Sequence, residues 1–209
     1  MRRTLEIVAV VAVFVVAREL VTATHRALWS PAIGWWSGLL FYALWIPLLV
    51  IHASLRTRPR VIPPSEMWTR RNVIVLAVAI AVTEWMYGMP ITRIATGQLA
   101  VHEPAAWQYL VNAMIAAPVI EEWIFRGVLW DELEARSSTW LAFVVTSVLF
   151  GPWHWSSFFA PSWYGSGQTF VWVHVMFGAL LGAVRWRFRA IGVGLVLHAL
   201  WNALVPLSG

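Results

Sequence analysis

Three charged side chains lie close together in an otherwise apolar stretch of the sequence. Glu121, Glu122 and Arg126 fall within six residues, inside an apolar run from about residue 105 to 130. In a membrane each such charge costs at least about 2.5 kcal/mol, so it must be paired, hydrated or used. Glu122 and Arg126 are four residues apart and can pair along one helix face, which leaves Glu121 turned toward another neighbour. A structural charge cluster that ties helices together is the alternative interpretation.

Two histidines in later apolar runs add to this cluster. His154 lies four residues after Phe150, and His198 lies four residues before Asn202, so each pair shares a helix face. At about 1.5 Å per residue, Glu121 and His154 are both roughly 22 to 24 Å from the charged turn that joins their runs. His198 has a comparable depth. One such histidine alone would indicate packing, but three polar groups at one depth predict a shared site.

Several other hydrolytic sites are excluded by residue type. The chain contains no Cys, and Asp131 is its one Asp, so a cysteine nucleophile and a di-aspartyl site are both ruled out. The pair His102-Glu103 lacks the second histidine of the zinc motif His-Glu-x-x-His, because Ala106 occupies that position. The serines in Gly-x-Ser settings have no base placed by the sequence.

A glutamate with histidines remains, and this combination can activate water. An apolar cavity strengthens a carboxylate as a base, so Glu121 with His154 can hold and deprotonate a water molecule. His198 and Asn202 can then donate hydrogen bonds to the oxyanion of a tetrahedral intermediate. Glu121, His154 and His198 are also ligands that catalytic zinc accepts, with water as the fourth. We favour a site without a cofactor, because the spaced His pairs that preorganise zinc are missing.

The composition is that of an integral membrane protein. Of the 209 residues, 60% are hydrophobic and 12% are charged, unlike an ordinary soluble domain. The sixteen Trp suit interfacial belts and packing within a membrane. All fifteen basic residues are Arg, and they lie between apolar runs rather than on one basic face. Nucleic-acid binding is therefore excluded, and the lipid bilayer is the expected partner.

Seven apolar runs predict an all-α integral membrane protein with about seven transmembrane helices. The runs cover about residues 5–21, 32–52, 72–89, 105–130, 138–155, 169–186 and 190–207. We interpret the first as a retained span rather than a signal peptide, and Pro47 predicts a kink in the second. The candidate catalytic residues fall in runs four, five and seven. We divide this single membrane domain into an N-terminal three-span region, 1–104, and a catalytic core, 105–209.

Other polar and small residues within the runs have structural interpretations. The Arg18, Glu19 pair and Glu84 are expected to be interhelical partners or near-interface groups, and His174 to serve packing or line a cavity. Gly178 and Gly182, four apart in the sixth run, predict close contact between helices.

The arginines are distributed unequally between the two sides of the expected membrane. With seven spans, eleven Arg fall on the side of the N-terminus, and only Arg26 and Arg93 fall on the other. This asymmetry predicts a cytoplasmic N-terminus and an outside C-terminus. The all-Arg, Trp-rich and Cys-free composition suggests a bacterial inner membrane.

The motif residues resemble those of a known family, the type II CAAX prenyl endopeptidases and bacteriocin-processing enzymes, abbreviated CPBP or Abi. Its pattern is Glu-Glu-x-x-x-Arg, then Phe-x-x-x-His, then His-x-x-x-Asn or Asp. In that order the chain has Glu121, Glu122 and Arg126, then Phe150 and His154, then His198 and Asn202. The resemblance covers about residues 105–207.

The resemblance implies an intramembrane endopeptidase that cleaves a membrane-anchored protein or peptide. It implies that Glu121 and His154 activate the water and that His198 and Asn202 stabilise the oxyanion. The other motif residues would support the site: Glu122, Arg126 and Phe150. The family has been described both as zinc-dependent and as glutamate-type, so the resemblance leaves the metal open. A small polytopic transporter and a non-catalytic membrane scaffold or immunity protein are the alternative functions.

Overall fold

The computed structural model describes residues 2–28, 36–55, 110–154 and 169–204, together with residues 69, 70, 73, 74, 77, 78, 80 and 81. This part of the chain contains helices and no strand, so the prediction of an all-α fold is confirmed for it. Most of the third apolar run, with Glu84, lies outside the described residues. The segments, with η marking π-helical ones, are α1 (Arg2–Leu28), α2 (Trp36–Ala43), α3 (Ile46–Leu55), η1 (Leu110–Ala116), α8 (Ala117–Glu122), η2 (Trp123–Leu129), α9 (Trp130–Arg136), α10 (Thr139–Trp153), α11 (Thr169–Phe188) and α12 (Gly192–Leu204).

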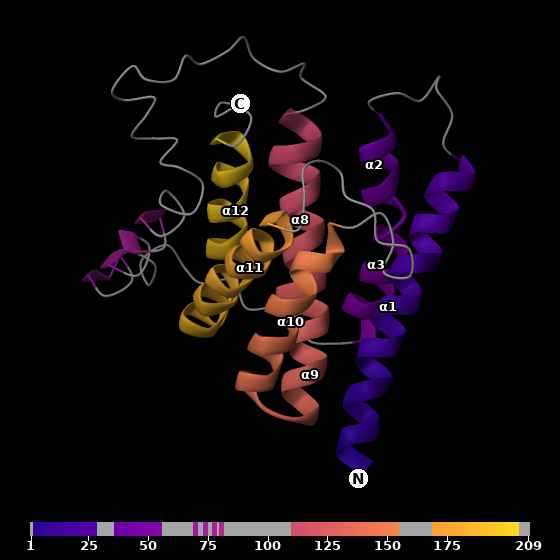
Figure 1. Ribbon diagram of the computed structural model, residues 1–209, viewed down its shortest axis with the longest axis horizontal. Coiled ribbons are helices and arrows are strands. Elements are labelled where there is room, and N and C mark those ends of the chain that lie inside the picture. The colour runs from indigo at the N-terminus through magenta and orange to yellow at the C-terminus, as the bar shows by residue number, and fades with distance from the viewer. Residues whose placement is uncertain are drawn as a thin grey trace.

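Four consecutive segments form the column that carries the two glutamates. η1, α8, η2 and α9 follow one another without a break from residue 110 to 136 (Figure 1). In the π-helical segments a backbone N–H can bond to the carbonyl five residues earlier, as the Trp130 N–H does to the Phe125 carbonyl. The turn that contains Glu121 and Glu122 is therefore a short α-helix between two wider turns, an arrangement that the sequence did not reveal.

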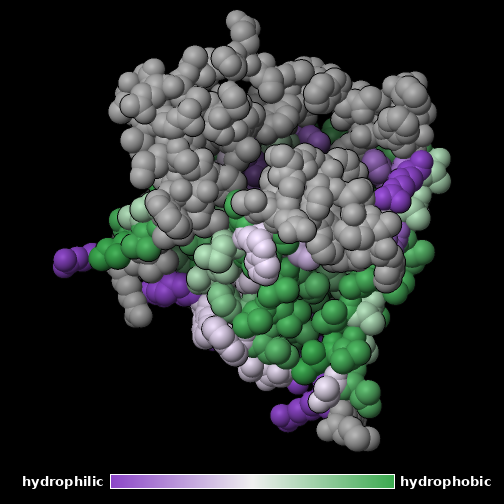
Figure 2. Space-filling view, in the orientation of Figure 1, coloured by the Kyte–Doolittle hydropathy of each residue, from purple (hydrophilic) through white to green (hydrophobic). Residues whose placement is uncertain are grey.

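α1 runs beside this column and has the character of a membrane span. It is the one helix in the described part that is long and apolar enough to cross a membrane, over Arg3–Leu28. Its Leu5, Val13 and Leu20 side chains are 63%, 69% and 63% exposed. Figure 2 shows hydrophobic side chains covering a broad area of the surface. Apolar side chains exposed along a whole helix are stable in lipid, where they need no protein cover. The total of about seven spans stays a prediction.

The kink predicted at Pro47 takes the form of a break between two helices. α2 ends at Ala43 and α3 begins at Ile46. Pro47 is the second residue of α3, where its missing N–H costs no helical hydrogen bond. Trp45 lies in the break, is buried, and packs against Trp153 with ring centroids 5.3 Å apart. The break thus brings the second apolar run against the end of α10.

The charged turn between α9 and α10 is held by its polar side chains. The Ser138 hydroxyl accepts a hydrogen bond from the Leu141 N–H at 3.2 Å and so caps α10. Glu134 accepts hydrogen bonds from Thr139 and Trp130. The turn therefore has a defined conformation although it lies at the end of the helices.

Glu134→Gln is expected to weaken the fold at neutral pH but not in acid. Burial raises the pKa of Glu134, but the hydrogen bonds from Thr139 and Trp130 and the charge of Arg189 outweigh it and hold the pKa below its ordinary value. Such a carboxylate stabilises the fold above its unfolded pKa, and the contribution is lost as pH falls through the lower, folded pKa. Thermal unfolding in detergent should therefore show a difference between wild type and variant at about pH 7 that shrinks toward about pH 3. A difference independent of pH would contradict this assignment.

The close contact between α10 and α11 depends on glycines. A Cβ at Gly178 would lie 2.8 Å from the Phe150 Cβ and 2.9 Å from the Ser147 carbonyl oxygen. A Cβ at Gly182 would lie 3.0 Å from the Phe143 ring. The prediction of close helix contact at Gly178 and Gly182 is confirmed, and this contact fixes the part of α10 that leads to His154.

Gly178→Ala is expected to destabilise the protein by about 1–3 kcal/mol, because the added methyl overpacks the contact with α10. Gly192→Ala is the matched control, since a Cβ there meets no atom within 4 Å. The control should be neutral or slightly stabilising, as Ala is the better helix former. The measurement is denaturant unfolding of both variants in the same detergent, and equal stabilities would show that the helices can move apart at no cost.

Candidate active site

Glu121 presents its two carboxylate oxygens to different partners. The residue lies on α8 and is 2% exposed. Its Oε1 accepts a hydrogen bond from the Tyr42 hydroxyl at 2.8 Å. Its Oε2 is buried and has no hydrogen-bond partner among the described residues. Oε1 is thus held by a hydrogen bond, while Oε2 faces its neighbours without a direct hydrogen bond.

Those neighbours are the two predicted histidines. The Nε2 atom of His198 lies 3.7 Å from Glu121 Oε2, and the Nε2 atom of His154 lies 4.0 Å from it. Both distances are too long for a direct hydrogen bond and suit groups bridged by a small polar molecule. The structure therefore brings together, from α8, α10 and α12, the three polar groups that the sequence placed at one depth.

The other ring nitrogen of each histidine is held by the protein. His154 Nδ1 lies 2.9 Å from the Phe150 carbonyl oxygen, which can only accept, so we assign the proton to Nδ1 and the lone pair to Nε2. His198 Nδ1 lies 3.2 Å from Glu122 Oε1. These contacts fix both rings with their Nε2 atoms toward Glu121.

Glu122 and Arg126 form the predicted ion pair and are completely buried. Arg126 Nη1 lies 3.0 Å from Glu122 Oε1, and Arg126 Nη2 donates to the Gly178 carbonyl at 2.7 Å. The guanidinium lies over the Phe150 ring, 4.5 Å from its centroid. Because Glu122 also contacts His198, the pair does more than stabilise its own helix. It links the column to α10, α11 and α12.

Phe150 packs between the two histidines. Its ring centroid lies 5.2 Å from that of His154 and 5.8 Å from that of His198, with the rings tilted edge to face. The side chain is fully buried and contacts both imidazole rings. The geometry is consistent with the supporting role that the motif implies for it.

Asn202 is held by a hydrogen bond to the column that carries the glutamates. Its Nδ2 donates a hydrogen bond to the Ala113 carbonyl in η1 at 2.7 Å. Asn202 lies one turn beyond His198 on α12, as the spacing predicted. Its role at an oxyanion stays a prediction.

These motif residues all lie within the part of the chain that matches a protein-family model. Residues 103–204 match the family model described as type II CAAX prenyl endopeptidase Rce1-like. These residues form an Rce1-like domain. The family that the motif residues resemble is thereby confirmed as the one whose model these residues match. No curated protein and no solved structure matches the chain.

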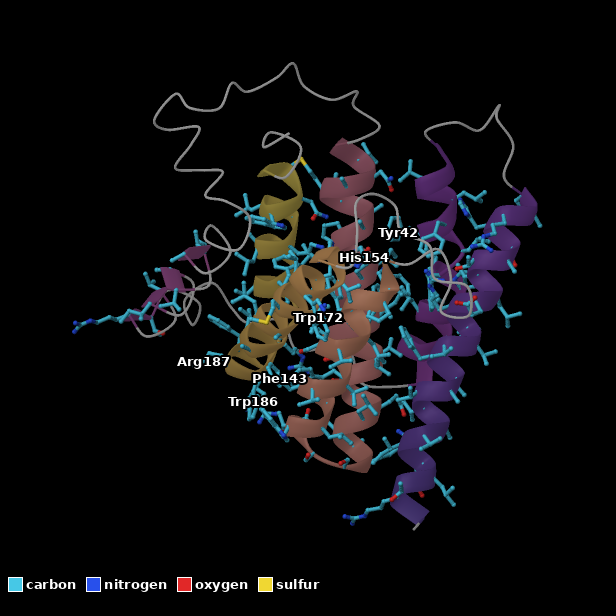
Figure 3. The ribbon with its side chains drawn as sticks, viewed as in Figure 1. Tyr42, Phe143, His154, Trp172, Trp186 and Arg187 are labelled. Atoms are coloured by element: carbon cyan, nitrogen blue, oxygen red, sulfur yellow. The ribbon has the colours of Figure 1, made fainter. Side chains whose placement is uncertain are left out.

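Two residues near the site of the Rce1-like domain were not assigned to it from the sequence. Tyr42 comes from α2, outside the matched residues, and lies at the same level as His154 (Figure 3). His174 on α11 has its ring centroid 3.9 Å from that of His154, so it packs against the site, and packing is one of the two roles expected for it. Neither residue lies in a spaced motif, so the sequence carried no signal that joined them to Glu121.

The three side chains at the site of the Rce1-like domain lie somewhat farther apart than the ligands of a tetrahedral zinc ion. Tetrahedral zinc with ligands at about 2.0–2.1 Å brings ligand atoms to about 3.4 Å from one another. Glu121 Oε2 is 3.7 and 4.0 Å from the two histidine nitrogens. In the described part of the chain, no three His, Cys, Asp or Glu side chains form a group that could hold a metal ion.

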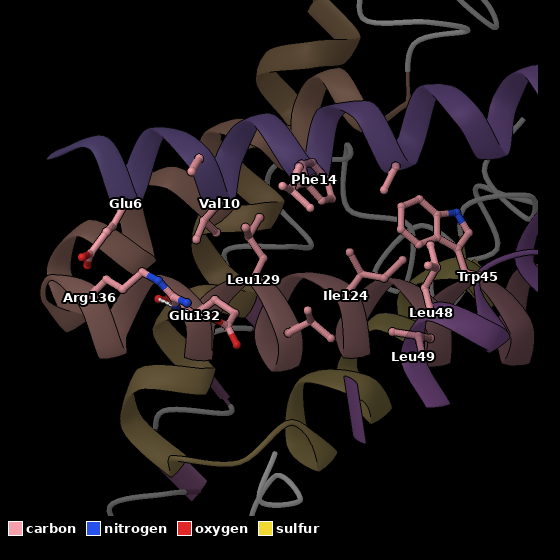
Figure 4. Close-up of a pocket in the computed structure, with 14 residues that line it drawn as sticks. Glu6, Val10, Phe14, Trp45, Leu48, Leu49, Ile124, Leu129, Glu132 and Arg136 are labelled. Atoms are coloured by element: carbon pink, nitrogen blue, oxygen red, sulfur yellow. Dashed lines mark hydrogen bonds and ion pairs between the residues drawn. The ribbon is translucent and has the colours of Figure 1, made fainter. Parts of the chain in front are cut away.

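An apolar pocket of about 560 Å³ lies beside the Rce1-like domain's column (Figure 4). α1 lines one side, η2 and α9 line the side that faces it, and Leu48 and Leu49 of α3 lie at the end with Trp45. Trp45 and Ile124 line one end, close to the level of Glu121, and the candidate catalytic residues are not among its lining residues. Charged side chains lie at the other end: Glu6, Glu132 and Arg136.

Proposed function

We propose that the protein is an intramembrane endopeptidase that hydrolyses a peptide bond of a membrane-associated substrate by metal-free, glutamate-type catalysis. The main support for this proposal is that Glu121 Oε2 lies within 4.0 Å of the Nε2 atoms of both His154 and His198. A water that donates one hydrogen bond to Glu121 Oε2 and one to His154 Nε2 would bridge the two side chains and satisfy Oε2. No described side chain does so for Oε2.

The proposed reaction begins with proton transfer from this water to Glu121 as its oxygen attacks the peptide carbonyl carbon. The carbonyl π bond opens, and the negative charge moves to the oxygen. His198 and Asn202 would donate hydrogen bonds to that oxyanion. Collapse of the intermediate breaks the C–N bond, and the proton held by Glu121 passes to the leaving amine. Water is consumed, and the glutamate returns to its starting form.

The oxyanion role requires a proton on His198 Nε2. Its Nδ1 faces Glu122 Oε1, and its Nε2 faces Glu121 Oε2. Both facing atoms are carboxylate oxygens, which accept hydrogen bonds, so each ring nitrogen of His198 has an acceptor opposite it. The nearby Arg126 compensates the charge of Glu122, which leaves His198 to interact with the reacting groups.

The apolar pocket provides space for the apolar part of a membrane-associated substrate. Its inner end, at Trp45 and Ile124, lies within one helical turn of Glu121 along the column. We further propose that about seven spans cross the bacterial inner membrane. The distribution of the arginines supports an orientation with the N-terminus in the cytoplasm and the C-terminus outside.

The deciding experiment uses the purified full chain in proteoliposomes with a membrane-anchored peptide. Mass spectrometry of the products should show one hydrolytic cleavage, and EDTA should not reduce its rate. Loss of activity with EDTA and recovery with Zn²⁺ would overturn metal-free catalysis. Activity that survives in both Glu121→Gln and His154→Ala would remove the mechanism and leave a transporter or scaffold as the better interpretation.

A further inference from the structure

Two helices outside the matched domain make direct polar contacts with its site. The family match begins at residue 103, whereas α1 and α2 end at Leu28 and Ala43. Tyr42 on α2 donates its hydroxyl to Glu121 Oε1, across 79 positions of sequence. Arg18 on α1 donates to the carbonyl of Trp153, across 135 positions. The Tyr42 contact reaches Glu121, a proposed catalytic residue, and the Arg18 contact reaches Trp153, which directly precedes His154.

The Tyr42 contact fixes the orientation of the Glu121 carboxylate. A glutamate side chain rotates about its terminal bond in a broad well, so burial alone does not determine where each oxygen points. The hydrogen bond of 2.8 Å to Oε1 selects the orientation in which Oε2 faces His154 and His198. The Tyr42 ring is itself held by edge-to-face packing on Phe41, with centroids 5.4 Å apart.

The Arg18 contact fixes the end of α10. The last carbonyls of a helix have no partner within the helix, and the Trp153 carbonyl is one of these. Arg18 is 3% exposed, and its Nη2 donates to that carbonyl at 3.1 Å. Its guanidinium also lies 5.9 Å from the centroid of the Trp153 ring. The next residue is His154, so the position of this histidine follows from how α10 ends.

We propose that Tyr42 and Arg18 are positioning residues, through which α1 and α2 complete the active site of the Rce1-like domain. Tyr42 acts through Glu121, and Arg18 acts through the Trp153 carbonyl on His154. Neither side chain is required to touch the substrate. This inference rests on the proposed function, because both residues act on groups that the mechanism uses.

The test for Tyr42 is a double-mutant cycle in the cleavage assay. Tyr42→Phe keeps the ring and removes the donor, so kcat per folded molecule should fall about tenfold while KM stays unchanged. Glu121→Asp shortens the side chain by one methylene and withdraws the carboxylate from Tyr42. In that background Tyr42→Phe should change kcat less than twofold. An equal loss in both backgrounds, or no loss in the wild-type background, would overturn the positioning role.

The test for Arg18 compares two neutral replacements. Arg18→Gln keeps an N–H donor and should retain kcat within about threefold, whereas Arg18→Met should lose about tenfold with KM unchanged. Equal kcat values for the two folded variants would overturn the role of Arg18. If Arg18→Met does not fold, the Tyr42 cycle, whose variants preserve packing, decides the proposal.

The outcomes also separate this inference from the proposed function. If Glu121→Gln cleaves at the wild-type rate, the proposed function is wrong. If Glu121→Gln is inactive and Tyr42→Phe and Arg18→Met both behave as wild type, the proposed function stands and the positioning inference is wrong.

Discussion

Glu121→Gln is expected to lower kcat/KM for cleavage of a membrane-anchored peptide by about 10³-fold. Glutamine has nearly the same size and can still accept the hydrogen bond from Tyr42 through its amide oxygen. What it loses is the ability to take a proton from water at the position of Oε2. The expected loss therefore measures general-base catalysis rather than a change in packing.

The matched control for this variant is Glu134→Gln, an identical substitution in α9 near the charged turn. Glu134 bonds to Thr139 and Arg189, far along the column from the proposed catalytic groups. Its activity per folded molecule at neutral pH should equal that of the wild type. Circular dichroism should show that Glu121→Gln is folded, and its thermal stability should be no lower than that of this control, which is itself expected to be weakened at neutral pH. Cleavage by Glu121→Gln within tenfold of the wild-type rate would contradict the role of Glu121.

Arg126→Met is expected to produce the largest loss of stability, about 3–5 kcal/mol. The substitution removes a charge that is fully buried and leaves the equally buried Glu122 without its closest cation. It also leaves the Gly178 carbonyl without the donor that lies 2.7 Å away. The measurement is denaturant unfolding of the full chain in detergent micelles.

Two comparisons make this stability prediction specific. Glu122→Gln combined with Arg126→Met should cost less than the sum of the single variants, because the remaining charge is removed with its partner. Arg189→Met should cost at most about 1 kcal/mol, since Arg189 is half exposed where it pairs with Glu134. If Arg126→Met and Arg189→Met were equally stable, the buried pair would not be a structural link.

The features that could be predicted from the sequence depend on spacing along one helix. Glu122 and Arg126 pair because residues four apart on a helix share a face. Gly178 and Gly182 permit close contact because both lie on the face of α11 toward α10. Glu121 and His154 meet because their two helices form a hairpin and lie equally far from its turn.

The features that could not be predicted depend on contacts between distant helices. The bond from Tyr42 to Glu121 joins α2 to the column, and no periodicity in the sequence relates these two segments. The contact between His198 and Glu122 likewise depends on how α12 is rotated against α8. Spacing gives the depth of such residues but not the rotation of their helices about their axes, and that rotation decides which ring nitrogen meets which carboxylate.

The π-helical segments on both sides of α8 have a consequence for insertions and deletions in this column. A π-helical turn holds one more residue per backbone hydrogen bond than an α-helical turn. Removing a residue such as Val128 from η2 can convert the wide turn to an ordinary one, with the residues on its two sides kept in register. The same deletion within a regular α-helix would rotate all that follows by about 100°. The column can thus change in length by one residue beside the glutamates while their direction toward His154 and His198 is conserved.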